Sequence, residues 1–353
     1  MSCPTKKLKV GIAGYGMVGK RRKLCVDKNP FLELVAVCDK KHQLETGAFQ
    51  RVQYFTDYTE LLKAELDILI VCLTNDLNAK VTAAGLAGGL HVFCEKPPGR
   101  NLDDMLLVIR AERKAPDCRL MYGFNHRYHQ SVHDALNIVR SNELGRVIHL
   151  RGVYGKSKLI TFDQTDWRTK RAIAGGGVLL DQGIHMVDLM RLFGGEFTEI
   201  QSIVDNSHWG FDVEDNAYAL MRTKSGIVAL LHSSATQWRH RFHLDINLEK
   251  GSLILGGLLT GTKSYGDETL TVVRVDHSLD RGEPREQLTR YNHDPSWELE
   301  IECFVNWIMH GKKPQHGSSQ DALRTMQLVQ DIYYSDQRWR KRFHIQDPSV
   351  LEI

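Results

Sequence analysis

The sequence predicts an α/β protein with two domains. The first is a doubly wound parallel sheet, and the second is an α+β domain built on a mostly antiparallel open sheet. Three observations carry this prediction: a glycine-rich segment near the N-terminus, strand and helix patterns that alternate up to about residue 122, and closely spaced strands after Val147. The pattern changes over 123–146, so we place the domains at 1–124 and 125–353.

The glycine-rich segment has the spacing of a dinucleotide-binding fingerprint. An apolar run over 8–13 is followed by Gly14, Gly16 and Gly19 in G-x-G-x-x-G spacing, then by a helix pattern and a second strand that ends at Asp39. The first glycine permits the tight turn, the second lets a pyrophosphate approach, and the third lets the helix pack on the strand. The helix N-terminus offers N–H groups to phosphates. An acid at the end of the second strand accepts hydrogen bonds from ribose hydroxyls. This context predicts a Rossmann domain, with a glycine-rich turn of another α/β fold as the alternative.

Continuous apolar runs recur downstream, as expected for parallel strands buried on both faces. We expect strands over 34–38, 66–73, 90–94 and 120–122, and helices over 17–28, 76–88 and 102–114. In such a sheet, ligands bind beyond the carboxyl ends of the strands. That rule selects the loops that begin near Gly14, Asp39, Thr74 and Glu95.

The second half of the chain has a different pattern. Strands are expected over 147–154, 197–205, 213–222, 226–235, 241–248, 251–255 and 268–275, and helices over 178–193, 296–310 and 319–338. Apolar and polar side chains alternate strictly over 241–248, a period of two that indicates a half-buried antiparallel strand. Residues 276–294 are polar, and we expect them to form a loop.

The composition is that of an ordinary globular protein. Of the 353 residues, 42% are hydrophobic and 25% are charged. A net charge of +3 without a basic tract argues against nucleic acid as a partner. The densest basic run, at 20–23, is interpreted as the solvated face of a helix. No apolar stretch approaches the roughly 18 residues of a membrane-spanning helix, and the N-terminus lacks a secretory signal.

The seven cysteines are odd in number and show no C-x-x-C spacing. Cys38, Cys72 and Cys94 fall in predicted strands. We interpret these three as small buried apolar side chains in a reducing compartment, neither disulfide-bonded nor bound to metal. The expected location is therefore the cytoplasm.

A lysine follows one predicted strand at the cofactor edge of the sheet. The segment Glu95-Lys96-Pro97-Pro98 comes directly after the strand over 90–94, and its prolines fix the backbone. Lys96 stands where a substrate hydroxyl would meet a nicotinamide. The alternative is an ordinary surface-loop lysine.

A glycine run over 175–177 leads into the helix that we expect from Val178. Asp181, His185 and Asp188 lie at i, i+4 and i+7, on one helix face. An acid and a histidine on one polar stripe suit general acid–base catalysis. The alternative is a capped amphipathic helix with a solvated acidic face.

Three further histidines, His126, His129 and His133, are also spaced for one helix face. No cysteine completes a recognisable metal set with them, although Asp134 is adjacent. We interpret this segment as a linker helix and predict no metal site.

The chain resembles the glucose–fructose oxidoreductase, inositol dehydrogenase and MocA (Gfo/Idh/MocA) family. The matching motifs are the G-x-G-x-x-G spacing, Glu95-Lys96-Pro97, Gly176-Gly177 with Asp181-x-Gly183-x-His185, and Gly123-Phe124-Asn125-x-Arg127. Together they span most of the chain in the family's order. The resemblance implies an NAD(P)-dependent enzyme acting on a CH–OH group of a carbohydrate or cyclitol. One departure is the segment Thr74-Asn75-Asp76, where many members carry Thr-Pro-Asn followed by histidine.

The resemblance also implies residue roles. Lys96, Asp181 and His185 match the family's catalytic lysine, aspartate and histidine. His185 would take or return the hydroxyl proton, and Asp181 would orient it or tune it electrostatically. Lys96 would stabilise charge on the reacting oxygen.

We assign the cofactor contacts to the turn and strand-end residues: Gly14, Gly16, Met17, Val18, Gly19, Asp39, Thr74, Asn75, Glu95, Lys96 and Asn125. NAD is the expected cofactor, because Asp39 would repel a 2′-phosphate. Lys40 and Lys41 follow at once and leave NADP as the alternative.

The expected substrate is a hexose carried on a nucleotide. Cationic and aromatic residues in loops suit a diphosphate and a ring. We assign substrate contacts to Lys96, Arg127, Tyr128, Trp167, Arg168, Asp181, His185 and Trp238, with Lys156, Lys158, Lys170, Arg171 and Arg239 as further cations. A free cyclitol or aldose is the alternative substrate. A non-enzymatic dinucleotide-binding regulator is the alternative class.

The second-domain sheet is expected to keep one face free of helices. Such a face needs covering, and family members commonly use it to self-associate. We therefore expect a homodimer or homotetramer.

Overall fold

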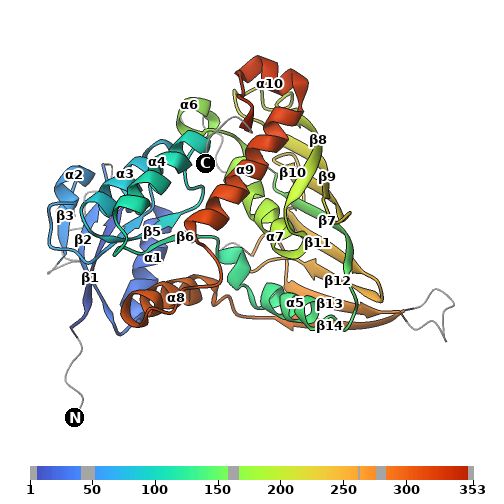
Figure 1. The fold of residues 1–353 in the computed structure, drawn as a ribbon, viewed down its shortest axis with the longest axis horizontal. Helices are drawn as coiled ribbons and strands as arrows, with labels where there is room; N and C mark the ends of the chain where they lie inside the picture. The colour runs from blue at the N-terminus through green and yellow to red at the C-terminus, as the bar shows by residue number, and fades with distance from the viewer. Residues whose placement is uncertain (1–5, 41–51, 158–166, 261–262, 276–283, 349–353) are drawn as a thin grey trace, which may run out of the picture. The chain divides into compact units, whose positions relative to one another are not determined.

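The computed structural model describes residues 6–40, 52–157, 167–260, 263–275 and 284–348 (Figure 1). The chain forms two compact units. One comprises Met1–Phe124 with Trp297–Leu323, and the other comprises Asn125–Ser296 with Arg324–Ile353. None of the helices in the described ranges has the length and apolar character needed to cross a membrane.

The first unit contains a six-stranded parallel sheet, as the sequence predicts. Its strands are β1 (Leu8–Ala13), β2 (Leu32–Cys38), β3 (Gln53–Phe55), β4 (Ile68–Val71), β5 (His91–Glu95) and β6 (Leu120–Gly123), in the order β3-β2-β1-β4-β5-β6. That order reverses direction between β1 and β4, the switch point at which Rossmann sheets bind dinucleotides. The helices are α1 (Met17–Lys28), α2 (Tyr58–Leu61), α3 (Asn75–Ala87) and α4 (Leu102–Lys114). Strand β3 and helix α2 were not predicted, because they are too short to show a periodic pattern.

Helix α8 (Ser296–His310) belongs almost entirely to the first unit, although the sequence analysis assigned all of 125–353 to the second domain. The reason is a buried charge cluster. Arg22 of α1 is fully buried; its Nε lies 2.6 Å from Glu95 Oε1 and its Nη2 lies 2.7 Å from Glu300 Oε2. The guanidinium also lies 4.3 Å from the ring centroid of Trp297. The basic run over 20–23 is therefore not wholly a solvated face, because Arg22 points into the unit and holds α8 there.

The second unit contains an eight-stranded sheet in the order β14-β13-β12-β11-β7-β10-β9-β8. Its strands are β7 (Val147–Gly155), β8 (Phe197–Asp205), β9 (Asn216–Thr223), β10 (Val228–Ser234), β11 (Arg241–Leu248), β12 (Gly251–Gly256), β13 (Glu268–Arg274) and β14 (Arg285–Tyr291). Only the β7–β10 pair is parallel. The mostly antiparallel sheet that the sequence predicts is confirmed.

Helical segments accompany this sheet. They are η1 (Asn125–Tyr128), α5 (Gln130–Ser141), η2 (Trp167–Thr169), α6 (Arg171–Ala174), η3 (Leu179–Gly183), α7 (Ile184–Gly194), α9 (Ser319–Ser335) and α10 (Gln337–Phe343). Figure 1 shows α5, α7 and α9 on one side of the sheet. The expected helix over 319–338 ends at Ser335, because Asp336 breaks it and its side chain caps α10.

The expected polar loop over 276–294 is wrong in part. Arg285–Tyr291 forms the edge strand β14, antiparallel to β13. Almost every residue of β14 is exposed, so the strand has no alternating apolar pattern to reveal it. Residues 276–283 lie outside the described ranges.

Candidate active site

The glycine turn of the first unit shows why each glycine is needed. Gly14 adopts φ +91°, and a Cβ there would lie 2.2 Å from the Cys72 carbonyl oxygen. A Cβ on Gly19 would lie 2.0 Å from the Gly14 oxygen, so only glycine lets α1 start this close to β1. A Cβ on Gly16, by contrast, would meet nothing within 4 Å. The open side at Gly16 fits the approach of a pyrophosphate to the start of α1.

Asp39 lies at the edge where the ribose of a dinucleotide would bind. Its Oδ2 accepts a 2.8 Å hydrogen bond from the backbone N–H of Tyr15, inside the glycine turn. The contact ties the end of β2 to the glycine turn. Met17, the first residue of α1, is 86% exposed, which leaves this side of the turn accessible. Lys41 lies outside the described residues.

The loop after β4 is joined to the Lys96 loop by Asn78, a residue that the sequence analysis did not single out. The buried Asn78 side chain accepts from the Leu73 N–H at 3.1 Å and donates to the Pro97 carbonyl at 2.9 Å. Thr74 precedes α3, and Asn75 is buried at its first position. Through these two hydrogen bonds, the Asn78 side-chain amide links the loop after β4, which departs from the family pattern, to the loop that carries Lys96.

Glu95 anchors the loop that carries Lys96. Its carboxylate is buried and accepts from Arg22, and its Oε2 lies close to where a Cβ on Gly123 would be. The sequence predicts Glu95 as a cofactor contact, and its carboxylate is engaged inside the unit by Arg22. Lys96 follows directly after β5 and is partly exposed.

In the second unit, a buried carboxylate fixes the start of the helix that bears Asp181 and His185. Glu214 accepts from the N–H groups of Gly177 at 2.7 Å and Leu179 at 2.9 Å, and from the Tyr333 hydroxyl at 2.7 Å. A Cβ on Gly177 would lie 2.0 Å from the Glu214 carbonyl oxygen, which explains that glycine. Burial raises the pKa of Glu214, and the hydrogen bonds oppose the rise. The expected α-helix begins as the π-turn η3 and continues as α7.

Asp181 lies on η3 between two cations. Lys156 Nζ, at the end of β7 and buried, lies 3.1 Å from Asp181 Oδ2. Arg168 Nε lies 3.7 Å from Asp181 Oδ1. Two positive neighbours favour the ionised carboxylate. The sequence predicts that Lys156 and Arg168 contact a substrate diphosphate. In the structure, both face the carboxylate of Asp181.

His185 lies in the first turn of α7, and its ring stacks on the ring of His126. The two imidazole rings are 3.7 Å apart between centroids and 12° from parallel. Both residues are buried. The sequence analysis assigned His126 to a linker helix and missed this contact. No local pattern reveals it, since 59 positions separate the two histidines in the chain.

Hydrogen bonds fix the ring of His126 in one tautomer. Asn125 Nδ2 donates to Ser296 Oγ, so Asn125 Oδ1 is left to accept from His126 Nδ1 at 3.2 Å. His126 Nε2 then accepts from the Tyr154 hydroxyl at 3.1 Å. Burial raises the pKa of Tyr154 well above its usual value, so its hydroxyl keeps its proton. An oriented imidazole thus covers one face of His185.

The other two histidines of that segment lie elsewhere. His129 is buried, and its Nδ1 lies 2.8 Å from Glu268 Oε2. The side chain of His133 is 61% exposed. The three rings therefore do not converge on a common point.

Most of the residues predicted to bind substrate are engaged within the second unit. Arg127 makes two 2.6 Å hydrogen bonds to Asp188, and both residues are buried, so the acidic helix face is not solvated at Asp188. Trp167 lies under the Arg168 guanidinium at 4.3 Å. Trp238 is 65% exposed.

The remaining members of that set differ from one another. Tyr128 ends η1 and is partly exposed, and Lys170 is exposed. Arg171 lies 4.6 Å from the Phe343 ring. Lys158 lies outside the described residues.

Comparison with known proteins agrees with both halves of this description. Residues 8–124 match the oxidoreductase family model with an NAD-binding Rossmann fold, and residues 132–254 match the GFO/IDH/MocA C-terminal domain. Inositol 2-dehydrogenase of Salmonella typhimurium is 27% identical over 325 residues, covering 89% of this chain and 90% of that protein. D-glucoside 3-dehydrogenase of Escherichia coli is 25% identical over 357 aligned positions, covering 93% and 95%.

A solved structure of a levoglucosan dehydrogenase in complex with NADH has the same fold, with a TM-score of 0.82 at 20% identity and coverage of 95% of this chain and 98% of that one. The chain belongs to the Gfo/Idh/MocA family of oxidoreductases, and its first unit is an NAD(P)-binding Rossmann domain.

The stacked histidines give a testable expectation. His126→Ala removes the ring that covers one face of His185, so we expect kcat to fall by about ten- to a hundredfold through loss of orientation. His126→Phe restores a ring and should recover part of the loss. The measurement is steady-state turnover of a sugar or cyclitol that the wild-type protein oxidises or reduces, with thermal melting to check folding.

His133→Ala is the matched control for these variants, because His133 is exposed on the neighbouring helix α5. It should leave kcat unchanged. Wild-type turnover in folded His126→Ala protein would contradict the positioning role.

Proposed function

We propose that this protein is an NAD(P)-dependent dehydrogenase or ketoreductase acting on a ring hydroxyl or ketone of a free sugar or cyclitol. The observation that carries the proposal is the pair of Asp181 and His185 on one helical segment, each with its own support: Lys156 for the carboxylate and His126 for the imidazole. The glycine turn and Asp39 of the first unit would bind the dinucleotide cofactor.

Each residue of the proposed site has a distinct role. A bound nicotinamide supplies or accepts the hydride. His185 takes the proton from the substrate hydroxyl or returns it to the ketone oxygen, as a general base or acid. Lys96 hydrogen-bonds that oxygen and stabilises its negative charge. Asp181 tunes the charge around the imidazole, within the field of Lys156 and Arg168.

The substrate in this proposal differs from the nucleotide-linked hexose expected from the sequence. Arg127, Lys156 and Arg168 supported a diphosphate, yet each is paired with a carboxylate of the same unit. The relatives named above act on inositol and on glucosides by their names. Both observations favour the free sugar or cyclitol. The intact set of Lys96, Asp181 and His185 also favours an enzyme over a regulator.

Self-association and location complete the proposal. The open face of the second-unit sheet carries Ile203, Leu220 and Leu230, which are 65%, 46% and 52% exposed. Burying such side chains stabilises an assembly, so we propose a homodimer or homotetramer. The six described cysteines are free thiols, which fits the reducing cytoplasm.

The assembly is tested by light scattering at micromolar concentration. We expect two or four times the 40.3 kDa chain mass. Leu230→Glu places a charge on the open face and should shift the mass towards the monomer. A monomeric wild type would refute the assembly.

Cofactor preference is the second measurement. Asp39 would repel a 2′-phosphate, so we expect a higher kcat/KM with NAD(H) than with NADP(H). Asp39→Ala should narrow the difference, because it removes that repulsion. A wild-type preference for NADP(H) would overturn this assignment.

Catalysis is tested with a panel of free hexoses, inositols and nucleotide-linked hexoses. We expect turnover of at least one free sugar or cyclitol. His185→Ala and Lys96→Ala should each lower kcat by about two to four orders of magnitude, the usual scale for such groups, while cofactor binding survives. Near-normal turnover in either variant would show that its assigned role is wrong, and turnover confined to nucleotide-linked sugars would reject the proposed substrate class.

A further inference from the structure

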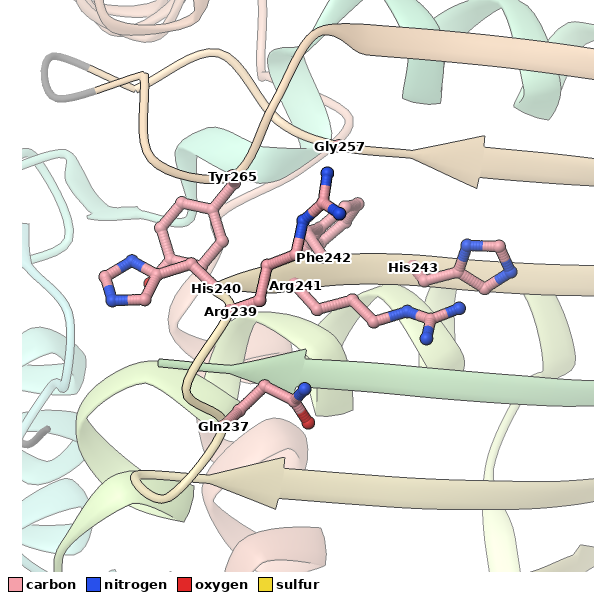
Figure 2. Close-up of a pocket in the computed structure, with 8 residues that line it drawn as sticks. All are labelled: Gln237, Arg239, His240, Arg241, Phe242, His243, Gly257 and Tyr265. Carbon is pink, nitrogen blue, oxygen red and sulfur yellow. The ribbon is translucent and has the colours of Figure 1, made fainter. Parts of the chain in front are cut away.

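A cavity of about 330 Å³ lies at one end of β11 in the second unit (Figure 2). Its lining comes from the segment that leads into β11, from β11 itself and from the loop after β12: Gln237, Arg239, His240, Arg241, Phe242, His243, Gly257 and Tyr265. The volume is at the lower end of that for small-molecule sites, so it suits one substituent of a sugar better than a dinucleotide.

The lining is cationic. It contains two arginines and two histidines, and no aspartate or glutamate. Burial, with the nearby charge of Lys156, lowers the pKa of His240, so its imidazole is neutral at neutral pH. His243 Nε2 lies 2.7 Å from Asp245 Oδ1, which engages that ring. The unbalanced positive charge therefore comes from Arg239 and Arg241.

These two arginines differ from the other cations near the site. Arg127, Lys156 and Arg168 each face a carboxylate. Both side chains are exposed, and within the described parts of the chain neither makes a side-chain hydrogen bond or an ion pair. Figure 2 shows both guanidinium groups beside β11, one directed towards Gly257 and the other lying along the strand towards His243.

Two residues of the lining are hydrogen-bonded to neighbours of Asp181. The Tyr265 hydroxyl donates to Gln182 Oε1 at 3.1 Å, and Gln182 follows Asp181 in the chain. On the other side, the Gln237 N–H donates to the Lys156 carbonyl at 3.0 Å, and Lys156 pairs with Asp181. Tyr265 and Gln237 thus connect the cavity to Gln182 and Lys156, the chain neighbour and the ion-pair partner of Asp181.

We propose that this cavity binds an anionic group of the substrate, a carboxylate or a phosphate, through Arg239 and Arg241. The inference rests on the proposed function and narrows it: the substrate is an acidic sugar or cyclitol, such as a sugar acid or a sugar phosphate. Guanidinium groups recognise both anions through paired N–H donors, and these two line a cavity without an acidic residue.

The test is calorimetric titration of the NAD(H)-loaded full-length protein at constant ionic strength. The ligands form a matched set: a hexose, its hexuronate, its 1-phosphate and its 6-phosphate. We expect at least one acidic member to bind tenfold or more tightly than the neutral hexose. The acidic member that gains affinity tells whether the group is a carboxylate or a phosphate. Equal affinity across the set would overturn the proposal.

The double variant Arg239→Gln/Arg241→Gln should abolish that advantage and leave binding of NAD(H) and the neutral hexose within twofold of wild type. Lys250→Gln is the control, because it removes one cation at the opposite end of β11, about 25 Å away by the rise of a strand. It should keep the full advantage. An advantage that survives in the double variant would also overturn the proposal.

This test does not depend on turnover. If no sugar reacts with the cofactor, the proposed function fails while the calorimetric comparison still reports on the cavity. If neutral sugars are turned over and acidic sugars bind no more tightly than neutral ones, the proposed function is supported and the anion site is refuted.

Discussion

The first unit depends on one buried guanidinium. Arg22 neutralises Glu95, which precedes Lys96, and Glu300, which lies 278 positions away on α8. Both carboxylates are buried, so loss of the arginine would leave two buried charges uncompensated, at a cost of about 3–5 kcal/mol. The same contact therefore sets the strand end that carries Lys96 and holds a distant helix in the dinucleotide-binding unit.

In the second unit, buried carboxylates likewise hold the helical segment formed by η3 and α7. Asp188 accepts from Arg127 and from Thr325, and Glu214 accepts from the backbone at the helix start. These contacts fix α7 and η3 at both ends of the segment that carries Asp181 and His185. The reactive groups are therefore oriented by buried charges that take no part in the proposed chemistry.

What the sequence predicts well is what depends on local pattern. The apolar runs of β1 and β5, the alternation of β11 and the three glycine roles follow from spacing alone. Sequence reasoning missed features whose partners are remote or whose pattern is absent. Arg22 was predicted to be a surface residue, because its partner Glu300 is 278 positions away in the sequence. Strand β14 has no buried face, so its sequence shows no alternation of apolar and polar residues. The contact of His126 with His185 was not predicted, because ring stacking between distant residues leaves no periodic pattern in the sequence.

The same distinction decides how positive charge is interpreted. From the sequence, every arginine in a predicted loop counts equally towards an anionic ligand. In the structure, Arg127 and Arg168 face carboxylates of their own unit, so most of their field is cancelled before any ligand arrives. Arg239 and Arg241 line a cavity that has no acidic residue, so their charge is not cancelled there. Selectivity for a charged substrate thus depends on which cations the fold leaves unbalanced, and a net charge of +3 says nothing about that.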